Sequence, residues 1–301
     1  MRVEQIGPPM HRTLPLVAAQ AAPRLIGEPL TGFADEVTEI LRTRPDTRLV
    51  VFPELHLFGD GSPDLQRTEA LQDSAQPLDG PRTRELRQLA GDLGVWLVPG
   101  SVCERGPEGQ LFNTLLVLSP RGELAGYYRK VFPWRPHEPY DPGDRFTTVD
   151  IDGVGRLGLN ICYDAWFPEV TRQLAWMGAE VILNVVKTTT ADRRQELVLA
   201  QANAIVNQVF MVSVNCAGPV GAGHSTIVDP EGRVLRSSAG DRPELLEVDL
   251  DLTRVERVRA EGTEGINRMW SQFRAGETPI DLPVYGGRMD PATWAPRPFE
   301  P

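Results

Sequence analysis

GLNICYDAWFPE (residues 158–169) is the stretch that decides the fold of this chain. An apolar, strand-like run ends at Cys162, and Pro168 then occupies the first turn of an expected helix. A lone cysteine is usually a small buried side chain. A thiol between a strand and a helix, however, resembles a nucleophile elbow, where N–H groups at the helix start favour a thiolate. The stretch therefore predicts an alternation of strands and helices with Cys162 as a candidate nucleophile.

Two other charged residues also follow apolar, strand-like runs. Glu54 comes after RLVVF (48–52) and Pro53, and Lys130 comes after LAGYY (124–128). Loops at strand ends are where catalytic groups collect in sheets covered by helices. A carboxylate, an ammonium and a thiol that converge there would make a base, an oxyanion stabiliser and a nucleophile. An ordinary strand-end carboxylate or a solvated lysine is the alternative for each residue taken alone.

Taken together, these motifs resemble those of the carbon–nitrogen hydrolase (nitrilase) family. The resemblance covers roughly residues 14 to 250 and includes the hairpin that ends in STIVDPEG (225–232). It implies a Glu54–Lys130–Cys162 catalytic triad and a second glutamate, Glu138, that holds the lysine. It also implies a four-layer αββα sandwich of two mixed sheets, a homodimer or higher homo-oligomer formed through the helices, and no cofactor.

The remaining pattern is that of a layered α/β protein with paired strands. Strands are expected at 14–20, 48–52, 95–103, 156–161, 179–186, 209–214 and 244–251, the last as an edge strand. Helices are expected at 33–43, 82–93, 168–178, 192–208 and 252–261, with Asp192 as an N-cap. Hairpins are expected at 111–128 and 224–238.

The same pattern divides the chain into three parts. Residues 1–13 form an N-terminal extension, 14–261 the carbon–nitrogen hydrolase domain, and 262–301 a tail rich in proline and glycine. The tail carries aromatic residues such as Trp270 and Tyr285, so we expect it to pack on its own subunit or on a partner.

Composition excludes several other classes of protein. The 301 residues include 31 basic and 41 acidic ones, for a net charge of −10, which argues against nucleic acid or an anionic membrane as a partner. No apolar run is long enough for a membrane span, and the first residues do not resemble a secretory signal. Three scattered cysteines predict reduced thiols and a cytoplasmic protein, with Cys103 and Cys216 in the core.

Metal and nucleotide sites are not expected either. The four histidines are isolated, which argues against zinc, and His56 and His137 are expected to be structural or to line the pocket. GVGRLG (153–158) spells GxGxxG but leads into a strand, so it predicts a turn and not a dinucleotide site.

The resemblance implies that the substrate is a small linear amide or an N-carbamoyl compound, and we expect it to bind near Tyr163, Trp166, Lys187 and Trp134. Trp166 stands where relatives that act on carboxylate-bearing amides often have an arginine, which favours a neutral or cationic substrate. Lys187, with Thr188 beside it, favours an anionic substrate instead, because its ammonium could bind a substrate carboxylate. Val206 departs from a glutamate usual in relatives and is expected to affect assembly.

The predicted reaction is metal-free hydrolysis of a non-peptide C–N bond through an acyl-enzyme on Cys162. Acyl transfer from the same intermediate and nitrile hydrolysis stay open as alternatives. A papain-type Cys–His dyad and a catalytically silent scaffold protein are two further alternatives, which fit the motifs less well.

Overall fold

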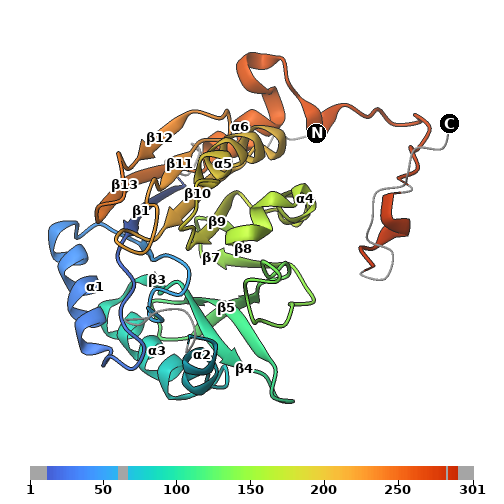
Figure 1. The fold of residues 1–301 in the computed structure, drawn as a ribbon. Coiled ribbons are helices and arrows are strands. Elements are labelled where there is room, and N and C mark those ends of the chain that lie inside the picture. The colour runs from blue at the N-terminus through green and yellow to red at the C-terminus, as the bar shows by residue number, and fades with distance from the viewer. Residues whose placement is uncertain (1–11, 60–66, 283, 291–301) are drawn as a thin grey trace.

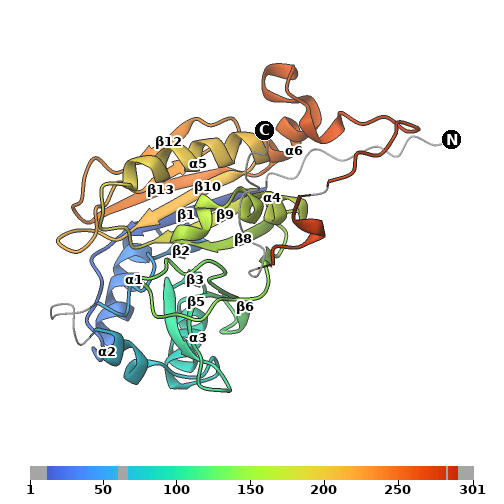
Figure 2. The same cartoon turned by 45° about the vertical axis from the view of Figure 1, so that its right-hand side comes forward.

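A computed structural model of the protein describes residues 12–59, 67–282 and 284–290. Two mixed β-sheets pack face to face, and helices cover the outer face of each (Figures 1 and 2). The predicted four-layer αββα sandwich is therefore confirmed. Most of the predicted N-terminal extension, residues 1–11, lies outside the described residues, as do residues 291–301 of the tail.

The first sheet has seven strands and the second has six. The first runs in the order β13 (Glu244–Asp251), β1 (Thr13–Gln20), β2 (Leu49–Val51), β3 (Trp96–Val98), β5 (Leu111–Leu118) and β4 (Ser101–Arg105), with β6 (Leu124–Arg129) also paired to β5. The second runs in the order β12 (Val234–Ser237), β11 (Thr226–Val228), β10 (Phe210–Asn215), β9 (Val181–Val186), β8 (Gly155–Ile161) and β7 (Thr147–Ile151). The predicted edge strand, β13, does lie at a sheet edge.

Side chains alternate along the strands, and this alternation produces the layers. In β1, Leu14 and Leu16 face the core between the sheets, whereas Val17 packs on the helix side. In β9, Leu183 belongs to the same inter-sheet core, and Ile182 packs beneath the helices of the second sheet. Both faces of central strands such as β2 and β9 are thus buried, which explains why these strands are almost wholly apolar.

The helices follow the predicted segments closely. α1 (Thr31–Thr43) and α3 (Pro81–Leu93) belong to the half of the chain that builds the first sheet, while α4 (Pro168–Trp176) and α5 (Arg193–Asn207) cover the second (Figure 2). α6 (Thr253–Glu261) was also predicted, and α2 (Arg67–Ser74) was not. Short 3₁₀ turns complete the set: η1 (Cys162–Trp166), η2 (Thr263–Gly265), η3 (Met269–Ser271) and η4 (Val284–Gly287).

One local prediction was wrong, and a second holds only for the position of the residue. The segment 95–103 is not one strand: it breaks at Gly100, and β5 inserts between its halves, β3 and β4. Gly100 has a φ of +85°, and a Cβ there would lie 1.9 Å from the carbonyl oxygen of Pro53. Asp192 occupies the N-cap position of α5, but its carboxylate makes no capping bond and instead accepts the hydroxyl of Thr190.

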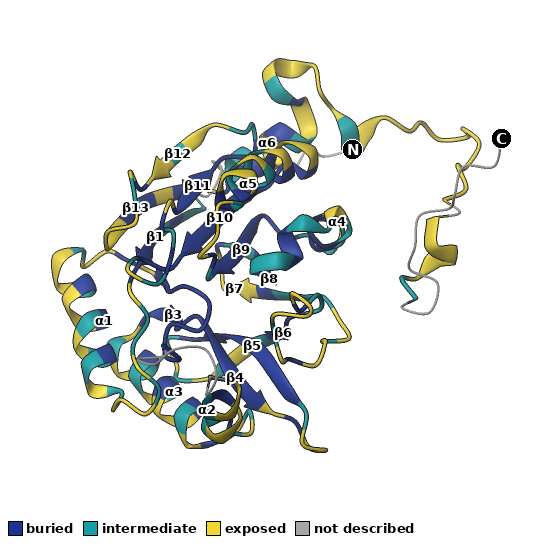
Figure 3. Cartoon of the chain, viewed as in Figure 1, coloured by how far each residue is buried: buried dark blue, intermediate teal, exposed yellow. Residues whose placement is uncertain are grey.

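The described part of the tail, residues 262–290, is mostly exposed (Figure 3). It touches its own chain at several places, among them Asn267, whose carbonyl accepts the side-chain amide of Gln208 at 2.9 Å. The ring of Trp270 lies 5.0 Å from the guanidinium of Arg172, and the hydroxyl of Tyr285 donates to Glu169 at 2.7 Å. The three-part division of the chain stays a prediction. No helix in the described ranges is long and apolar enough to cross a membrane.

Candidate active site

Glu54 lies in a tight loop just beyond the end of β2. The loop is held by Leu55, whose φ is +51° and whose backbone N–H donates to the hydroxyl of Ser101 at 3.0 Å. Gly100 allows the chain after β3 to approach Pro53, and so supports the same loop. The carboxylate of Glu54 is buried, with only 2% exposure, and accepts a bond from the side-chain amide of Asn113 at 2.8 Å.

Lys130 is fully buried between two carboxylates. Its Nζ lies 3.1 Å from Oε1 of Glu54 and 2.7 Å from Oε1 of Glu138. Burial alone would lower the pKa of this ammonium, but Glu54, Cys162 and Glu138 together raise it above its usual value. Lys130 therefore stays charged in the folded protein. The predicted contact between Lys130 and Glu138 is present.

Glu138 is held on its other side by the backbone. Its Oε2 accepts the N–H of Trp134 at 3.0 Å. Burial raises the pKa of Glu138, Lys130 lowers it, and repulsion from Glu54 raises it again, so that the net shift is upward. Two carboxylates thus share one ammonium.

Cys162 begins η1 directly after β8, in a left-handed conformation with a φ of +49°. Non-glycine residues at positive φ are uncommon and mark a sharp, strained turn. The pKa of the thiol is raised well above its usual value by burial and by the charge of Glu54, which outweigh the lowering effect of Lys130. Burial and the nearby carboxylates thus favour the protonated thiol, against the thiolate that the N–H groups at the start of η1 would favour.

Asp164, which was not among the predicted site residues, ties the Cys162 turn to the loop that follows Lys130. Its carboxylate accepts the backbone N–H of Ile161, the backbone N–H of Phe132 and the hydroxyl of Tyr128, each at 2.9 Å. Burial raises the pKa of Asp164 to about 7 against the lowering effects of Lys130 and of these three donors. A carboxylate two residues after the nucleophile, inside an apolar run, was the available signal.

A second missed group lies behind the sulfur. The hydroxyl of Thr188 is 3.8 Å from Sγ of Cys162 and bonds to the carboxylate of Glu196. Arg193, also on α5, donates to Glu196 at 2.9 Å. Thr188 is thus directed to the nucleophile and to Glu196, and its part with Lys187 in meeting a substrate carboxylate stays a prediction.

The predicted substrate-binding residues stay predictions. Tyr163 and Trp166 flank the nucleophile on η1 with their ring centroids 6.3 Å apart, and Trp134 is 38% exposed in the loop that carries Glu138. Lys187 follows β9 and lies near enough to Cys216 to lower the pKa of that thiol, which burial raises to about 12 overall. All four are therefore near the ends of the strands that carry the site.

The two histidines beside the site are not placed for a Cys–His dyad. His56 is buried against Phe33 and Phe52, and its Nε2 lies 3.6 Å from Glu36. His137 packs on Trp134 with ring centroids 4.2 Å apart. Within the described ranges, no group of histidine, cysteine or acidic residues could hold a metal ion. Cys103 and Cys216 are buried, as predicted.

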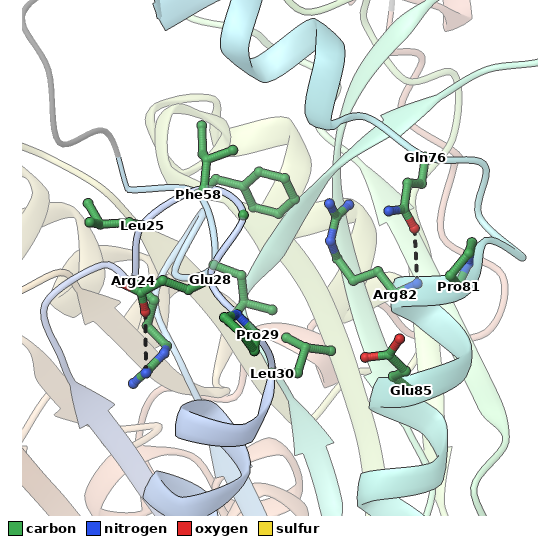
Figure 4. Close-up of a pocket in the computed structure, with 13 residues that line it drawn as sticks. Arg24, Leu25, Glu28, Pro29, Leu30, Phe58, Gln76, Pro81, Arg82 and Glu85 are labelled. Atoms are coloured by element: carbon green, nitrogen blue, oxygen red, sulfur yellow. Dashed lines mark hydrogen bonds and ion pairs between the residues drawn. The ribbon is translucent and has the colours of Figure 1, made fainter.

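A surface cavity of about 220 Å³ lies next to the Glu54 loop (Figure 4). It is bordered by Leu57 and Phe58 and by the charged side chains of Arg24, Arg82 and Glu85. None of Glu54, Lys130, Glu138 and Cys162 is among the residues that line it. The cavity is therefore separate from the candidate active site.

Comparison with known sequences agrees with this geometry. The sequence model described as carbon-nitrogen hydrolase matches residues 19–260. A formamidase of Pseudomonas syringae pv. tomato is 34% identical over 230 residues, which cover 74% of this chain and 66% of that protein. An (R)-stereoselective amidase of Pseudomonas sp. is 38% identical over 221 residues, which cover 70% of this chain and 77% of that protein. The chain thus spans just under two thirds of the length of the formamidase.

Solved structures of nitrilase-superfamily proteins share the fold of this chain. Saccharomyces cerevisiae Nit3, a member of branch 10 of the nitrilase superfamily, superposes with a TM-score of 0.73 at 26% identity, covering 83% of this chain and 94% of that one. A mutant amidase from Nesterenkonia sp. AN1 superposes with a TM-score of 0.68 at 27% identity, covering 84% of this chain and 97% of that one. That structure shows the acetamide moiety of fluoroacetamide added covalently at the active-site cysteine.

Proposed function

The chain belongs to the carbon-nitrogen hydrolase family, and on this premise we propose that it hydrolyses the C–N bond of a small non-peptide amide or N-carbamoyl compound. One observation carries the proposal: the buried Lys130 ammonium is hydrogen-bonded to Glu54 and Glu138 and lies close enough to Cys162 for the two groups to shift each other's pKa. The amidase and formamidase relatives support an amide over a nitrile as the substrate.

In this proposal Glu54 is the general base and Cys162 the nucleophile. Because the resting thiol is protonated, Glu54 must take its proton as the sulfur attacks the carbonyl carbon. The oxyanion forms next to Lys130 and the backbone N–H of Tyr163 at the start of η1. Preorganised donors of this kind typically contribute about 10²–10³ in rate each. Glu138 keeps the ammonium in place.

The second half of the reaction uses the same groups. Glu54 passes its proton to the leaving amine, and the acyl group stays on the sulfur as a thioester. Glu54 then takes a proton from water, whose hydroxide attacks the thioester and releases the acid, and Glu54 returns this proton to the departing sulfur to restore the thiol. The result is ping-pong kinetics with an acyl-enzyme intermediate.

A panel of amides, including formamide, and N-carbamoyl compounds tests the reaction class by ammonia release. We expect release from at least one class with wild type and none with Cys162→Ala. Adding hydroxylamine during turnover separates hydrolysis from acyl transfer, since a transferase would form acid slowly without an added acceptor. Ammonia release that persists in Cys162→Ala would refute the proposal.

We propose that the substrate is neutral or cationic at the end away from the scissile bond. Trp166 offers an aromatic surface for an alkyl stem or an ammonium. The test is kcat/KM for matched amides that end in methyl, amine or carboxylate, in wild type and in Lys187→Ala. A carboxylate preference that disappears in Lys187→Ala would contradict the role of Trp166 and make Lys187 the specificity residue.

We further propose that the protein is a homo-oligomer of a reducing compartment such as the cytoplasm. The outer faces of α4 and α5 expose apolar side chains, among them Trp176 at 74% and Val198 at 65%. An apolar surface on two adjacent helices is typical of a subunit interface. The free thiols of Cys162 and Cys216 agree with a reducing environment.

A further inference from the structure

A row of buried polar side chains leads from the nucleophile into α5. Oγ1 of Thr188 lies 3.8 Å from Sγ of Cys162 and 2.8 and 2.9 Å from the two carboxylate oxygens of Glu196. Nη1 of Arg193 donates to Glu196 at 2.9 Å. The side chains of Glu196 and Arg193 are only 6% and 3% exposed, so the ion pair is shielded from water.

The chemistry of these groups fixes the direction of the hydrogen bonds. An ionised carboxylate only accepts, and a threonine hydroxyl has a single proton to donate. With both oxygens of Glu196 within 2.9 Å, the hydroxyl proton of Thr188 points to Glu196. The side of Oγ1 that faces Cys162 therefore carries lone pairs. In the contact between the two residues, the S–H of Cys162 must be the donor.

Thr188 and Arg193 are both held in place by further bonds. The backbone N–H of Thr188 donates to Oδ1 of Asn215 at 2.9 Å, and Nδ2 of Asn215 donates to the carbonyl of Thr188 at 3.1 Å. Arg193 donates to the carbonyl of His224 at 2.9 Å. Neither end of the row can turn without breaking several bonds. A buried ion pair of this kind costs desolvation and rarely adds stability, which points to a role at the site.

We propose that Thr188, held by Glu196 and Arg193, accepts the S–H bond of Cys162 and so keeps the resting thiol protonated and fixed in direction until the substrate arrives. This role rests on the proposed function of Cys162 as the nucleophile. When Glu54 takes the proton, Thr188 cannot donate to the sulfur anion without releasing Glu196. The anion is thus stabilised by Lys130 and by bond formation to the substrate, and a free thiolate does not persist.

The charged groups around the sulfur act in the same direction. Glu54 follows β2, Lys130 and Glu138 belong to the segment after β6, and Glu196 lies on α5. Burial and Glu54 raise the pKa of the Cys162 thiol, Lys130 lowers it, and Glu196 and Glu138 raise it further. Glu196 therefore favours the thiol both through its charge and through the direction it imposes on Thr188.

The rate of Cys162 alkylation by iodoacetamide, measured against pH by peptide mass spectrometry, tests the proposal without any turnover. In Glu196→Gln the negative charge is gone, and the new amide can donate to Thr188, which frees the hydroxyl proton to face the sulfur. We expect the midpoint of alkylation to fall by about one pH unit, which makes alkylation near neutral pH about tenfold faster.

Glu180→Gln is the matched control, because it breaks another largely buried pair, with Arg12 at 2.8 Å, away from the site. Its midpoint should equal that of wild type. An unchanged or higher midpoint in Glu196→Gln would overturn the proposal. Because this measurement needs no substrate, it can succeed even if amide hydrolysis itself is refuted.

A second pair of variants covers the possibility that Glu196→Gln does not fold. Thr188→Ser keeps the hydroxyl, and Thr188→Val replaces it with a methyl of similar size. We expect an alkylation midpoint near that of wild type for Thr188→Ser and a lower one for Thr188→Val, which cannot accept the S–H bond, so that alkylation near neutral pH is about fivefold faster, the typical effect of one hydrogen bond. Equal midpoints for the two variants would mean that the hydroxyl has no role.

Discussion

The charges around Lys130 give the most information about the reaction. A fully buried ammonium needs one counter-charge, and this one has two, Glu54 and Glu138. One carboxylate suffices to hold the charge, so the other is free to exchange protons with the nucleophile and the leaving group. Glu138 uses both of its oxygens, for Lys130 and for the backbone N–H of Trp134. By contrast, Lys130 and Asn113 both bond to Oε1 of Glu54, which leaves its Oε2 for proton transfer.

The first prediction concerns this charge arrangement. Lys130→Ala removes the cation that faces the oxyanion, and we expect kcat to fall by at least about 10²–10³. It also leaves two buried carboxylates without their partner, which should lower the free energy of unfolding by about 3–5 kcal/mol. Steady-state kinetics and urea unfolding measure the two effects.

The double variant Lys130→Ala/Glu138→Gln separates the two roles of the lysine. Removing one carboxylate should restore part of the stability and none of the activity. Recovery of turnover in the double variant would show that Lys130 serves only to balance charge.

At the scale of elements, the site depends on strand ends and on the links between them. The sequence predicted that Glu54, Lys130 and Cys162 follow apolar strands, and β2, β6 and β8 do end just before them. It could not predict Asp164 or Thr188 as partners, since their contacts join segments distant in the chain. The break at Gly100 was missed for the same reason, because it reflects the approach of Pro53 and the insertion of β5.

The resting state of Cys162 shows the limit of local reasoning most clearly. The start of η1 suggested a thiolate, but the pKa depends on burial and on carboxylates that come from other elements. Residue order alone does not give those distances. The type and position of the reactive groups could be predicted from the sequence, but their protonation states could not.

Asp164 supplies the prediction at this scale. Its pKa of about 7 in the fold lies above the ordinary value of 3.8, so the folded state binds the proton more tightly than the unfolded chain. The stability that this proton contributes is present in full below about pH 4 and is lost as the pH rises through about 7. Asp164→Asn cannot titrate and should lack this loss.

Urea unfolding of wild type and Asp164→Asn between pH 5 and 8 checks this. The free energy of unfolding of wild type should fall relative to that of the variant as the pH rises. The variant should also be less stable at the lower pH values, since an amide cannot accept the three bonds that Asp164 accepts. A difference that does not change with pH would contradict the assigned shift.

At the scale of the whole molecule, the site is assembled from both sheets. Glu54 and Lys130 follow strands of the first sheet, and Cys162 and Thr188 follow strands of the second. The reactive groups therefore meet only when the sheets pack face to face. This arrangement explains why so much of the chain is devoted to an apolar core around a few polar side chains.

Assembly gives the prediction at this scale. Val198 and Val206 are 65% and 44% exposed on α5, on the surface that we assign to the subunit contact. Val198→Glu and Val206→Glu should each shift the protein toward the monomer in analytical ultracentrifugation. Leu25→Glu, at a position 47% exposed beside the separate surface cavity, is the control and should leave assembly unchanged. Unaltered assembly in both valine variants would exclude this face as the contact.

Identification of the residue that carries the acyl group tests the central claim most directly. Wild type would be quenched with acid during turnover of a small amide, digested and mapped by mass spectrometry. We predict an acyl mass on the peptide that contains Cys162, its release by hydroxylamine as expected of a thioester, and its absence in Cys162→Ala. An acyl group on Cys103 or Cys216, or continued turnover by Cys162→Ala, would contradict the account.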